Sequence, residues 1–223
     1  MKKSAFIFFV LILFSNVFAN EIDYKNITKI EMDVLRNDKI IGYSNYFFKH
    51  NKDNMIVENY TEFAVDLLGI KVFSINSKSK EIYKNDKLLS FESTTLQNDK
   101  KKFVKLINDK NKYIINGSSF VGEASQENII GNWWNAKILK TKTQISPLSG
   151  SVKKQEVKFI NEDQIEYKGK KIKLSRFKLK STEDLPDDKK LDFDILLEPN
   201  EGIIFKVKYN RLGSWEYRLK NYE

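Results

Sequence analysis

The chain has 223 residues, a formal net charge of +9, one His and no Cys. That length suits one large all-β domain or two small ones. The composition excludes disulfides, a Cys–His nucleophile pair, a lipid-modified cysteine and the usual His/Cys zinc site. A glycine-rich nucleotide-binding motif is also absent from the sequence. We therefore predict a protein held together by its hydrophobic core, without a metal, a cofactor or enzymatic activity.

Residues 1–19 have the pattern of a secretory signal peptide. Lys2 and Lys3 precede an apolar run at residues 5–14, and a short segment then leads to Ala19. The alternative is a retained membrane anchor, but a membrane-spanning helix needs about 20 apolar residues. We expect cleavage near Ala19, export to a bacterial periplasm and a soluble domain over residues 20–223.

The basic charge of the expected mature chain comes almost entirely from lysine. Removing Lys2 and Lys3 lowers the net charge from +9 to +7, and only four residues are Arg. Proteins that bind nucleic acids favour the planar, bidentate guanidinium group of Arg. We therefore expect lysine-covered, solvated sheet faces and no nucleic-acid partner. Anionic lipid headgroups are the charged partner that fits an exported protein better.

Alternating apolar and polar residues predict strands throughout the N-terminal half. Turn-forming Asn and Asp residues at 36–39 and 84–87 separate these runs. The predicted strands cover residues 30–34, 40–48, 55–67, 70–83 and 88–96, and further strands follow the Asn-Asp-Lys turns at 98–100 and 108–110.

Residues 121–140 lack this alternation and contain two adjacent tryptophans. We predict a short helix near 134–139, with Asn132 or Asn135 close to its start. Trp133, Trp134 and Asn135 are the candidate ligand or partner contacts, because exposed aromatic rings favour apolar or stacking contacts. We favour the interpretation that the pair closes one end of a barrel, with Trp134 buried and Trp133 nearer the rim.

The alternation resumes towards the C-terminus. Predicted strands cover residues 151–160, 164–168, 171–180, 191–197, 203–209 and 215–219. The last three place Phe193, Phe205, Val207, Trp215 and Tyr217 on a buried face, and Lys206, Lys208, Glu216 and Arg218 on a solvated one. One buried face per strand indicates an antiparallel sheet. We predict an all-β fold, a single large antiparallel meander curled into a barrel or half-barrel.

Acidic residues provide the one enzymatic alternative. Glu58, Glu62 and Asp66 share one face of a predicted strand, and Glu81 and Glu92 are placed to face each other across a hairpin. A glycoside hydrolase needs two carboxylates about 5 to 9 Å apart in a cleft. Solvated charges on a sheet face explain the same pattern.

Several short motifs resemble a family of exported bacterial β-proteins known only as a domain of unknown function. The similarity spans most of residues 27–220 and implies a long meander around a short helix, without assigned catalytic residues. The matching motifs are Gly42, the stretch from Leu67 to Val72, the stretch from Glu81 to Leu89, Trp134-Asn135, Thr141-x-Thr143, the stretch from Leu191 to Asp194 and the stretch from Gly213 to Leu219. Ala136, Gln144 and Leu196 depart from the family pattern.

Three functional hypotheses follow. The first is a periplasmic protein whose curled sheet binds a lipid or another apolar ligand. The second is a structural or assembly partner of an envelope protein, with the sheet edge or the tryptophan segment as the contact. The third is the carboxylate-dependent hydrolase.

Overall fold

The computed structural model describes residues 24–187 and 189–223. The predicted signal peptide and its cleavage site at Ala19 lie outside the described residues. Within the described part of the chain, no helix is long and apolar enough to cross a membrane.

The described residues form one 15-stranded sheet in which nearly every strand pairs with its neighbour in sequence. The pairs are antiparallel except for the short parallel pair of β9 and β10. The first eight strands are β1 (Lys29–Arg36), β2 (Lys39–Asn51), β3 (Asn54–Leu67), β4 (Ile70–Lys84), β5 (Lys87–Gln97), β6 (Lys100–Asp109), β7 (Lys112–Gly117) and β8 (Phe120–Ser125). The remaining strands are β9 (Ile129–Ile130), β10 (Thr143–Ile145), β11 (Val152–Tyr167), β12 (Lys170–Ser181), β13 (Asp192–Glu198), β14 (Ile203–Asn210) and β15 (Ser214–Tyr222).

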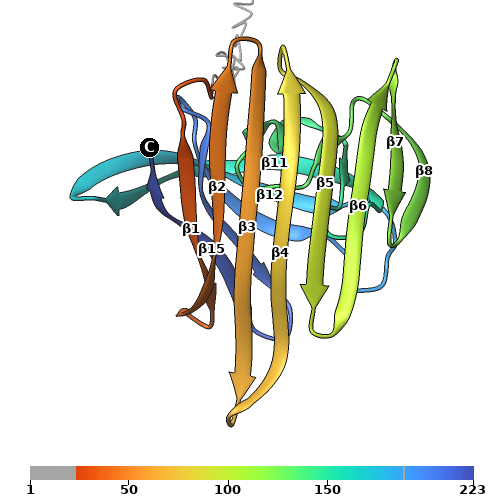
Figure 1. Ribbon diagram of the computed structural model, residues 1–223. Coiled ribbons are helices and arrows are strands. Elements are labelled where there is room, and N and C mark those ends of the chain that lie inside the picture. Colours follow the sequence, from red (N-terminus) through yellow and green to blue (C-terminus); the bar gives the residue numbers. More distant parts are fainter. Residues whose placement is uncertain (1–23, 188) are drawn as a thin grey trace, which may run out of the picture.

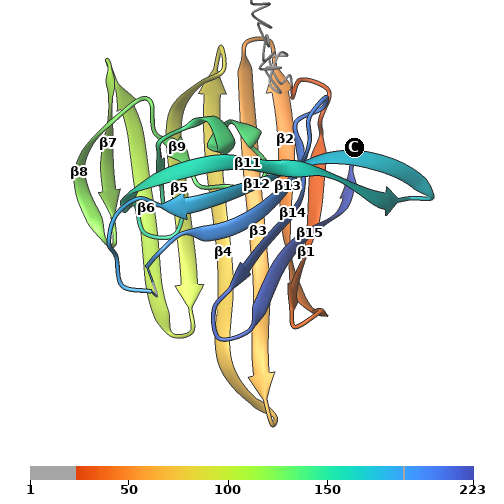
Figure 2. The same cartoon turned by 180° about the vertical axis from the view of Figure 1, so that it is seen from behind.

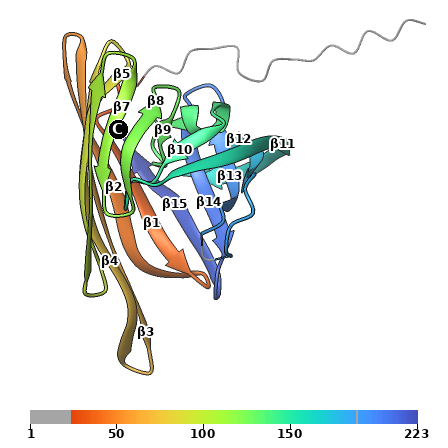
Figure 3. The same ribbon diagram turned by 90° about the vertical axis from the view of Figure 1, so that its right-hand side faces the viewer.

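The sheet folds over on itself where β1 pairs with β15. Strands β1–β8 form one layer (Figure 1), and β11–β14 cross its other side at a large angle, nearest the viewer in Figure 2. Viewed from the side, the two layers diverge from that shared region (Figure 3). The sheet order ends at β8 and β9, which do not pair with each other, so the sheet stays open. The predicted all-β meander is confirmed, in its half-barrel form.

The predicted tight turns form as the sequence indicates. Asn37 and Asp38 between β1 and β2, and Asn85 and Asp86 between β4 and β5, all have positive φ angles between 47° and 63°. This geometry matches the right-handed twist of the flanking strands, and Asn and Asp tolerate it well. Local sequence therefore determines the register of these hairpins.

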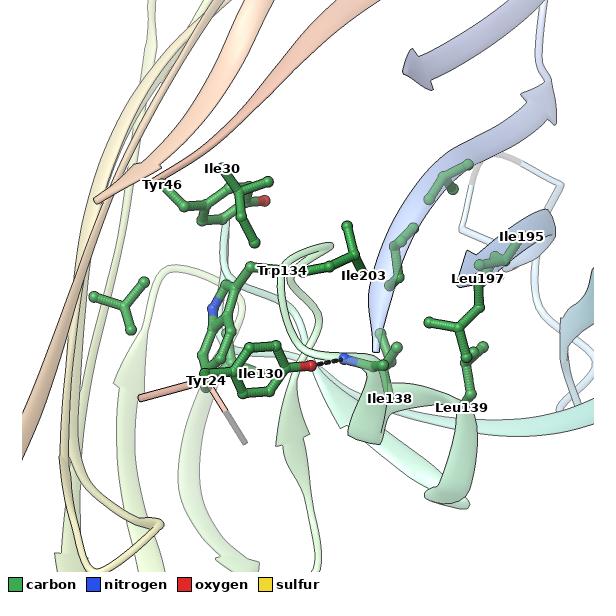
Figure 4. Packing of buried hydrophobic residues seen from close by; sticks show 14 of the residues in the cluster. Tyr24, Ile30, Tyr46, Ile130, Trp134, Ile138, Leu139, Ile195, Leu197 and Ile203 are labelled. Atoms are coloured by element: carbon green, nitrogen blue, oxygen red, sulfur yellow. Dashed lines mark hydrogen bonds between the residues drawn. The ribbon is translucent and has the colours of Figure 1, made fainter. Parts of the chain in front are cut away.

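The main core lies between the two layers and is centred on Trp134 (Figure 4). The predicted helix is a 3₁₀ helix, η1 (Ala136–Lys140), and starts later than expected. Asn135 caps it by accepting a hydrogen bond from the Lys137 amide, which is the usual role of Asn at this position. Tyr24 accepts a 2.9 Å bond from the Ala136 amide and so ties the start of the described chain to η1.

The C-terminal strands follow the predicted alternation only in part. Phe205 and Val207 are buried in the main core, and Trp215 is buried in a second, smaller cluster with Val34 and Phe63. Phe193 and Tyr217 are half-buried.

The prediction that Glu216 is exposed is wrong. Its side chain is 6% exposed and accepts a 2.5 Å bond from Arg218 Nε, with Lys206 Nζ 3.8 Å away. The basic neighbours compensate the buried charge of Glu216, an arrangement that strand periodicity does not reveal.

Replacing Phe205 by Ala should lower the free energy of unfolding by about 3–5 kcal/mol, as large-to-small changes in cores do. The ring is 3% exposed and packs edge-on against Tyr167 at 5.1 Å. Lys208→Ala, on an exposed neighbouring position, should change the stability by less than about 0.5 kcal/mol. Urea unfolding of the two variants measures this difference, and equal losses would contradict the assigned strand faces.

Candidate functional site

A groove of about 840 Å³ lies between the two layers. One side is formed by β2, β3 and β4, and the other by segment 131–133, loop 146–148 and strands β13–β15. The smaller core cluster of Val34, Phe63 and Trp215 lies at one end of the groove, because Phe63 belongs both to that cluster and to the lining. The groove therefore occupies the space that the divergent layers leave beside the Trp134 core.

Small polar side chains line the β2–β4 side, which we call the hydroxyl floor: Ser44, Asn59, Thr61, Ser77 and Ser79. Strand register aligns them, because Ser44 pairs with Thr61 and Thr61 pairs with Ser77. The row continues to Thr95, whose Oγ1 is 2.7 Å from Ser77 Oγ. An inward-facing row of polar residues breaks the apolar pattern that the same strands show elsewhere.

Three members of the hydroxyl floor form a closed ring of hydrogen bonds. Thr61 Oγ1 donates to Asn59 Oδ1 at 3.0 Å, and Asn59 Nδ2 donates to Ser44 Oγ at 3.2 Å. The ring closes over 2.7 Å between Ser44 and Thr61, where Ser44 is the donor because each hydroxyl has a single proton. Asn59 Nδ2 also donates to the Asn45 carbonyl. The ring thus uses its own donors, and its remaining lone pairs can accept hydrogen bonds from a ligand.

Aromatic rings form the opposite side, which we call the aromatic wall: Trp133, Phe193, Tyr209 and Tyr217. Trp133 packs against Phe193 with centroids 5.0 Å apart, and Phe193 packs against Tyr209 at 5.5 Å. Burial raises the pKa of Tyr209 to about 12, so its hydroxyl stays protonated at neutral pH. The wall offers a continuous apolar surface with occasional hydroxyl groups.

Charges at the rim of the groove largely compensate one another. Lys190 Nζ lies 3.2 Å from Asp187, and Arg211 donates to the Asp187 carbonyl at 3.3 Å. Asp192 pairs with Lys178. The groove therefore does not present a strong field of one sign.

The predicted contact residues separate into two groups. Trp133 lines the groove, whereas Trp134 is 1% exposed and Asn135 is 5% exposed. The predicted difference in burial is confirmed: Trp134 is buried and Trp133 lies nearer the surface. Trp134 and Asn135 use their polar atoms within the protein, and so the structure leaves Trp133 as the contact candidate of the three.

A buried carboxylate holds Trp134 in place. Glu81, 1% exposed on β4, accepts bonds from Trp134 Nε1 at 2.8 Å, Asn132 Nδ2 at 2.6 Å and Tyr83 Oη at 2.5 Å. Burial raises the pKa of Glu81, and the three donors act against that rise. These bonds join β4 to the segment that precedes η1.

The carboxylate pairs proposed from the sequence do not form. Glu81 pairs in register with Phe91 and Glu92 pairs with Lys80, so the two carboxylates point to opposite faces of the sheet. Glu58 and Glu62 lie outside the core, bonded to Lys49 and Tyr43 respectively. In the described part of the chain, no group of three His, Asp or Glu side chains is placed to hold a metal ion.

The fold and the groove together define a β-barrel-like protein with an open, folded-over sheet. The chain belongs to the family described as a domain of unknown function, DUF6134, which matches residues 32–220. The resemblance found in the sequence motifs to a domain of unknown function is thereby confirmed. No curated protein matches the sequence.

A solved structure shares the architecture. The β-barrel-like protein of the domain of unknown function DUF1849 from Brucella abortus aligns with a TM-score of 0.62 and 10% identity. The alignment covers 88% of this chain and 97% of the Brucella protein. At this identity the similarity concerns the fold alone.

Trp134→Ala should lower the free energy of unfolding by about 3–5 kcal/mol, because it opens a cavity and leaves Glu81 with one donor fewer. Trp133→Ala should cost about 1 kcal/mol, since the side chain is only half-buried. Denaturant unfolding of the two single variants compares them. Equal costs would contradict the separate roles assigned to the two rings.

Glu81 should make the protein less stable as the pH rises above the ordinary glutamate value of 4.5. A carboxyl group with a raised pKa binds more protons in the folded state, so stability falls between the unfolded and folded pKa values. Glu81→Gln keeps an acceptor for Trp134 and Asn132 and should remove this part of the pH dependence. Urea midpoints between pH 4 and 7 test it, and parallel curves for both proteins would rule the idea out.

Proposed function

We propose that this protein is an exported envelope protein that binds an amphipathic ligand in the groove between its two layers. The observation that carries the proposal is the chemistry of the groove, a hydroxyl floor opposite an aromatic wall. A ligand with hydrogen-bond donors on one side and hydrocarbon on the other would match both surfaces. The signal-like residues 1–19 support export.

The groove chemistry narrows the sequence hypothesis of a lipid or another apolar ligand to an amphipathic ligand. An apolar molecule would cover the polar atoms of the hydroxyl floor without hydrogen-bonding to them, which costs free energy. A ligand with hydroxyl or amine groups would avoid that cost, because the closed ring of Ser44, Asn59 and Thr61 supplies acceptors. The aromatic wall would then contact the ligand's hydrocarbon.

An amphiphile of known structure provides the test. The wild-type protein should bind n-dodecyl-β-maltoside below its micelle-forming concentration, measured by isothermal titration calorimetry. Ser79→Phe places a ring in the groove and should weaken binding at least about tenfold, or about 1.4 kcal/mol. Thr61→Val, which keeps the side-chain shape and removes a hydroxyl, should weaken it less.

Lys78→Phe is the matched control, because Lys78 is the neighbour of Ser79 on β4 and faces solvent on the outer side of the sheet. It should bind like the wild type. Unfolding midpoints show that each variant is folded. The proposal fails if the wild type gives no binding signal, or if Ser79→Phe binds as well as Lys78→Phe.

A further inference from the structure

The hairpin of β3 and β4 extends beyond the rest of the sheet. Pairing of β2 with β3 ends at Phe63, and pairing of β4 with β5 starts at Ile75. Residues 64–74 therefore form a two-stranded ribbon without lateral strand neighbours, which we call the ribbon. It is the lowest part of the molecule in Figures 1 and 3. The five residues from Ala64 to Leu68 correspond to about 16 Å at about 3.3 Å per residue.

The ribbon carries large apolar side chains in full contact with solvent. Leu68 at its tip is 96% exposed, Ile70 is 69% exposed, Leu67 is 61% exposed and Val72 is 47% exposed. Such a contiguous cluster on a projecting element is unusual for a surface that meets only water. The exposed end therefore favours an apolar environment.

The choice of residue at the turn strengthens this interpretation. Leu68 has a φ of 51°, a left-handed conformation that Asn adopts far more readily than Leu. The corresponding positions of the other two-residue turns with this conformation hold Asn or Lys: Asn37, Lys52, Asn85, Asn98, Lys110 and Lys168. A polar residue would suit the turn at least as well, so turn geometry does not explain the leucine.

The base of the ribbon is anchored while its tip is free. Val65 is buried in the smaller core cluster, and Phe73 packs edge-on against Trp215 at 6.0 Å. Asp66 pairs with Lys71 in strand register, which balances the ribbon's own charges. The apolar tip is thus held on a short, supported stem rather than on a loose loop.

Basic residues surround the ribbon at the same end of the molecule. The β1–β2 and β14–β15 turns lie side by side there, because Arg36 donates to the Leu212 carbonyl and Ser214 to Asn37 Oδ1. The β5–β6 turn also lies there, since Asn98 accepts a bond from the Ser74 amide at the ribbon's base. These turns and the strand residues directly flanking them hold four basic residues against two acidic ones: Arg36, Lys39, Lys100 and Arg211, with Asp38 and Asp99.

We propose that the ribbon inserts its tip into the headgroup region of an anionic lipid bilayer, with the surrounding basic turns on the membrane surface. A protein partner fits less well, since a stable protein interface needs about 800 Å² on each side and a narrow convex tip offers far less. Exposed apolar side chains next to basic residues match the two parts of an anionic membrane surface. Leu212, 91% exposed at the β14–β15 turn, adds a second apolar contact at this end.

Vesicle co-sedimentation with the mature full-length protein is the first measurement. The wild type should bind vesicles of phosphatidylglycerol and phosphatidylcholine, and less at 0.5 M salt, because salt screens the basic turns. Leu68→Asn/Ile70→Thr should reduce binding about tenfold or more, and both substitutions suit their turn and strand positions. Ile107→Thr, which removes an exposed apolar side chain near the far end of β6, should not change it.

A site-specific probe distinguishes insertion from simple surface attraction. Because the chain has no Cys, Leu68→Cys and Lys52→Cys each provide one labelling site for a nitrobenzoxadiazole dye. Both positions lie at hairpin turns with positive φ, at opposite ends of β3. Dye at position 68 should shift to the blue with anionic vesicles, and dye at position 52 should not.

Equal dye responses at the two positions would overturn the proposal, as would unchanged vesicle binding of the double variant. If the wild type forms dimers that the double variant lacks and does not bind vesicles, the ribbon contacts a second copy instead. The double variant should retain dodecyl maltoside binding, since the ribbon is outside the groove. Its loss of vesicle binding therefore tests the ribbon separately from the groove.

Discussion

The hydrogen bonds that Glu81 accepts between the layers are the constraint on which the rest of the structure depends. Glu81 lies on β4, in the layer formed by β1–β8, and its donors Asn132 and Trp134 belong to the segment leading into η1. A buried carboxylate with three donors is fixed in position, because each lost bond would leave a buried polar group unpaired. Trp134 therefore holds the layers apart at one place, and the Trp134 core fills that space. Next to the Trp134 core the two layers stay separated, and the space between them is the groove.

The sequence predicts the local structure well because its signals are local. Alternation fixes which residues face inward, and turns such as Asn85-Asp86 fix the hairpin register. The fold-over of the sheet depends instead on β1 pairing with β15, a contact between the two ends of the described chain. No sequence pattern indicates which two distant strands pair with each other. For the same reason Glu216 was expected in solvent, since Arg218 and Lys206 cover it only in the folded protein.

The candidate site could be predicted only in part. The sequence indicates Trp133 as a candidate contact, because it belongs to a pair of adjacent tryptophans in a segment without strand alternation. The hydroxyl floor was missed, although Asn59 and Thr61 lie at the same strand parity as Val57 and Phe63. Polar residues at inward positions are the available signal, and breaks in an otherwise consistent pattern are where functional sites are expected. Predicting that these residues align across β2, β3 and β4 requires the strand register, which is a property of the folded sheet.

The two proposed surfaces are connected through the same end of the molecule. Arg211 and Leu212 belong to the groove lining, and they also lie on the turn next to the β1–β2 hairpin at the ribbon end. Insertion of the ribbon would bring this turn, with the groove-lining residues Arg211 and Leu212, close to the lipid headgroups. Exposed leucines at the tip and a polar floor inside the fold are both unfavourable in isolation, and a lipid-facing role gives both the same physical reason.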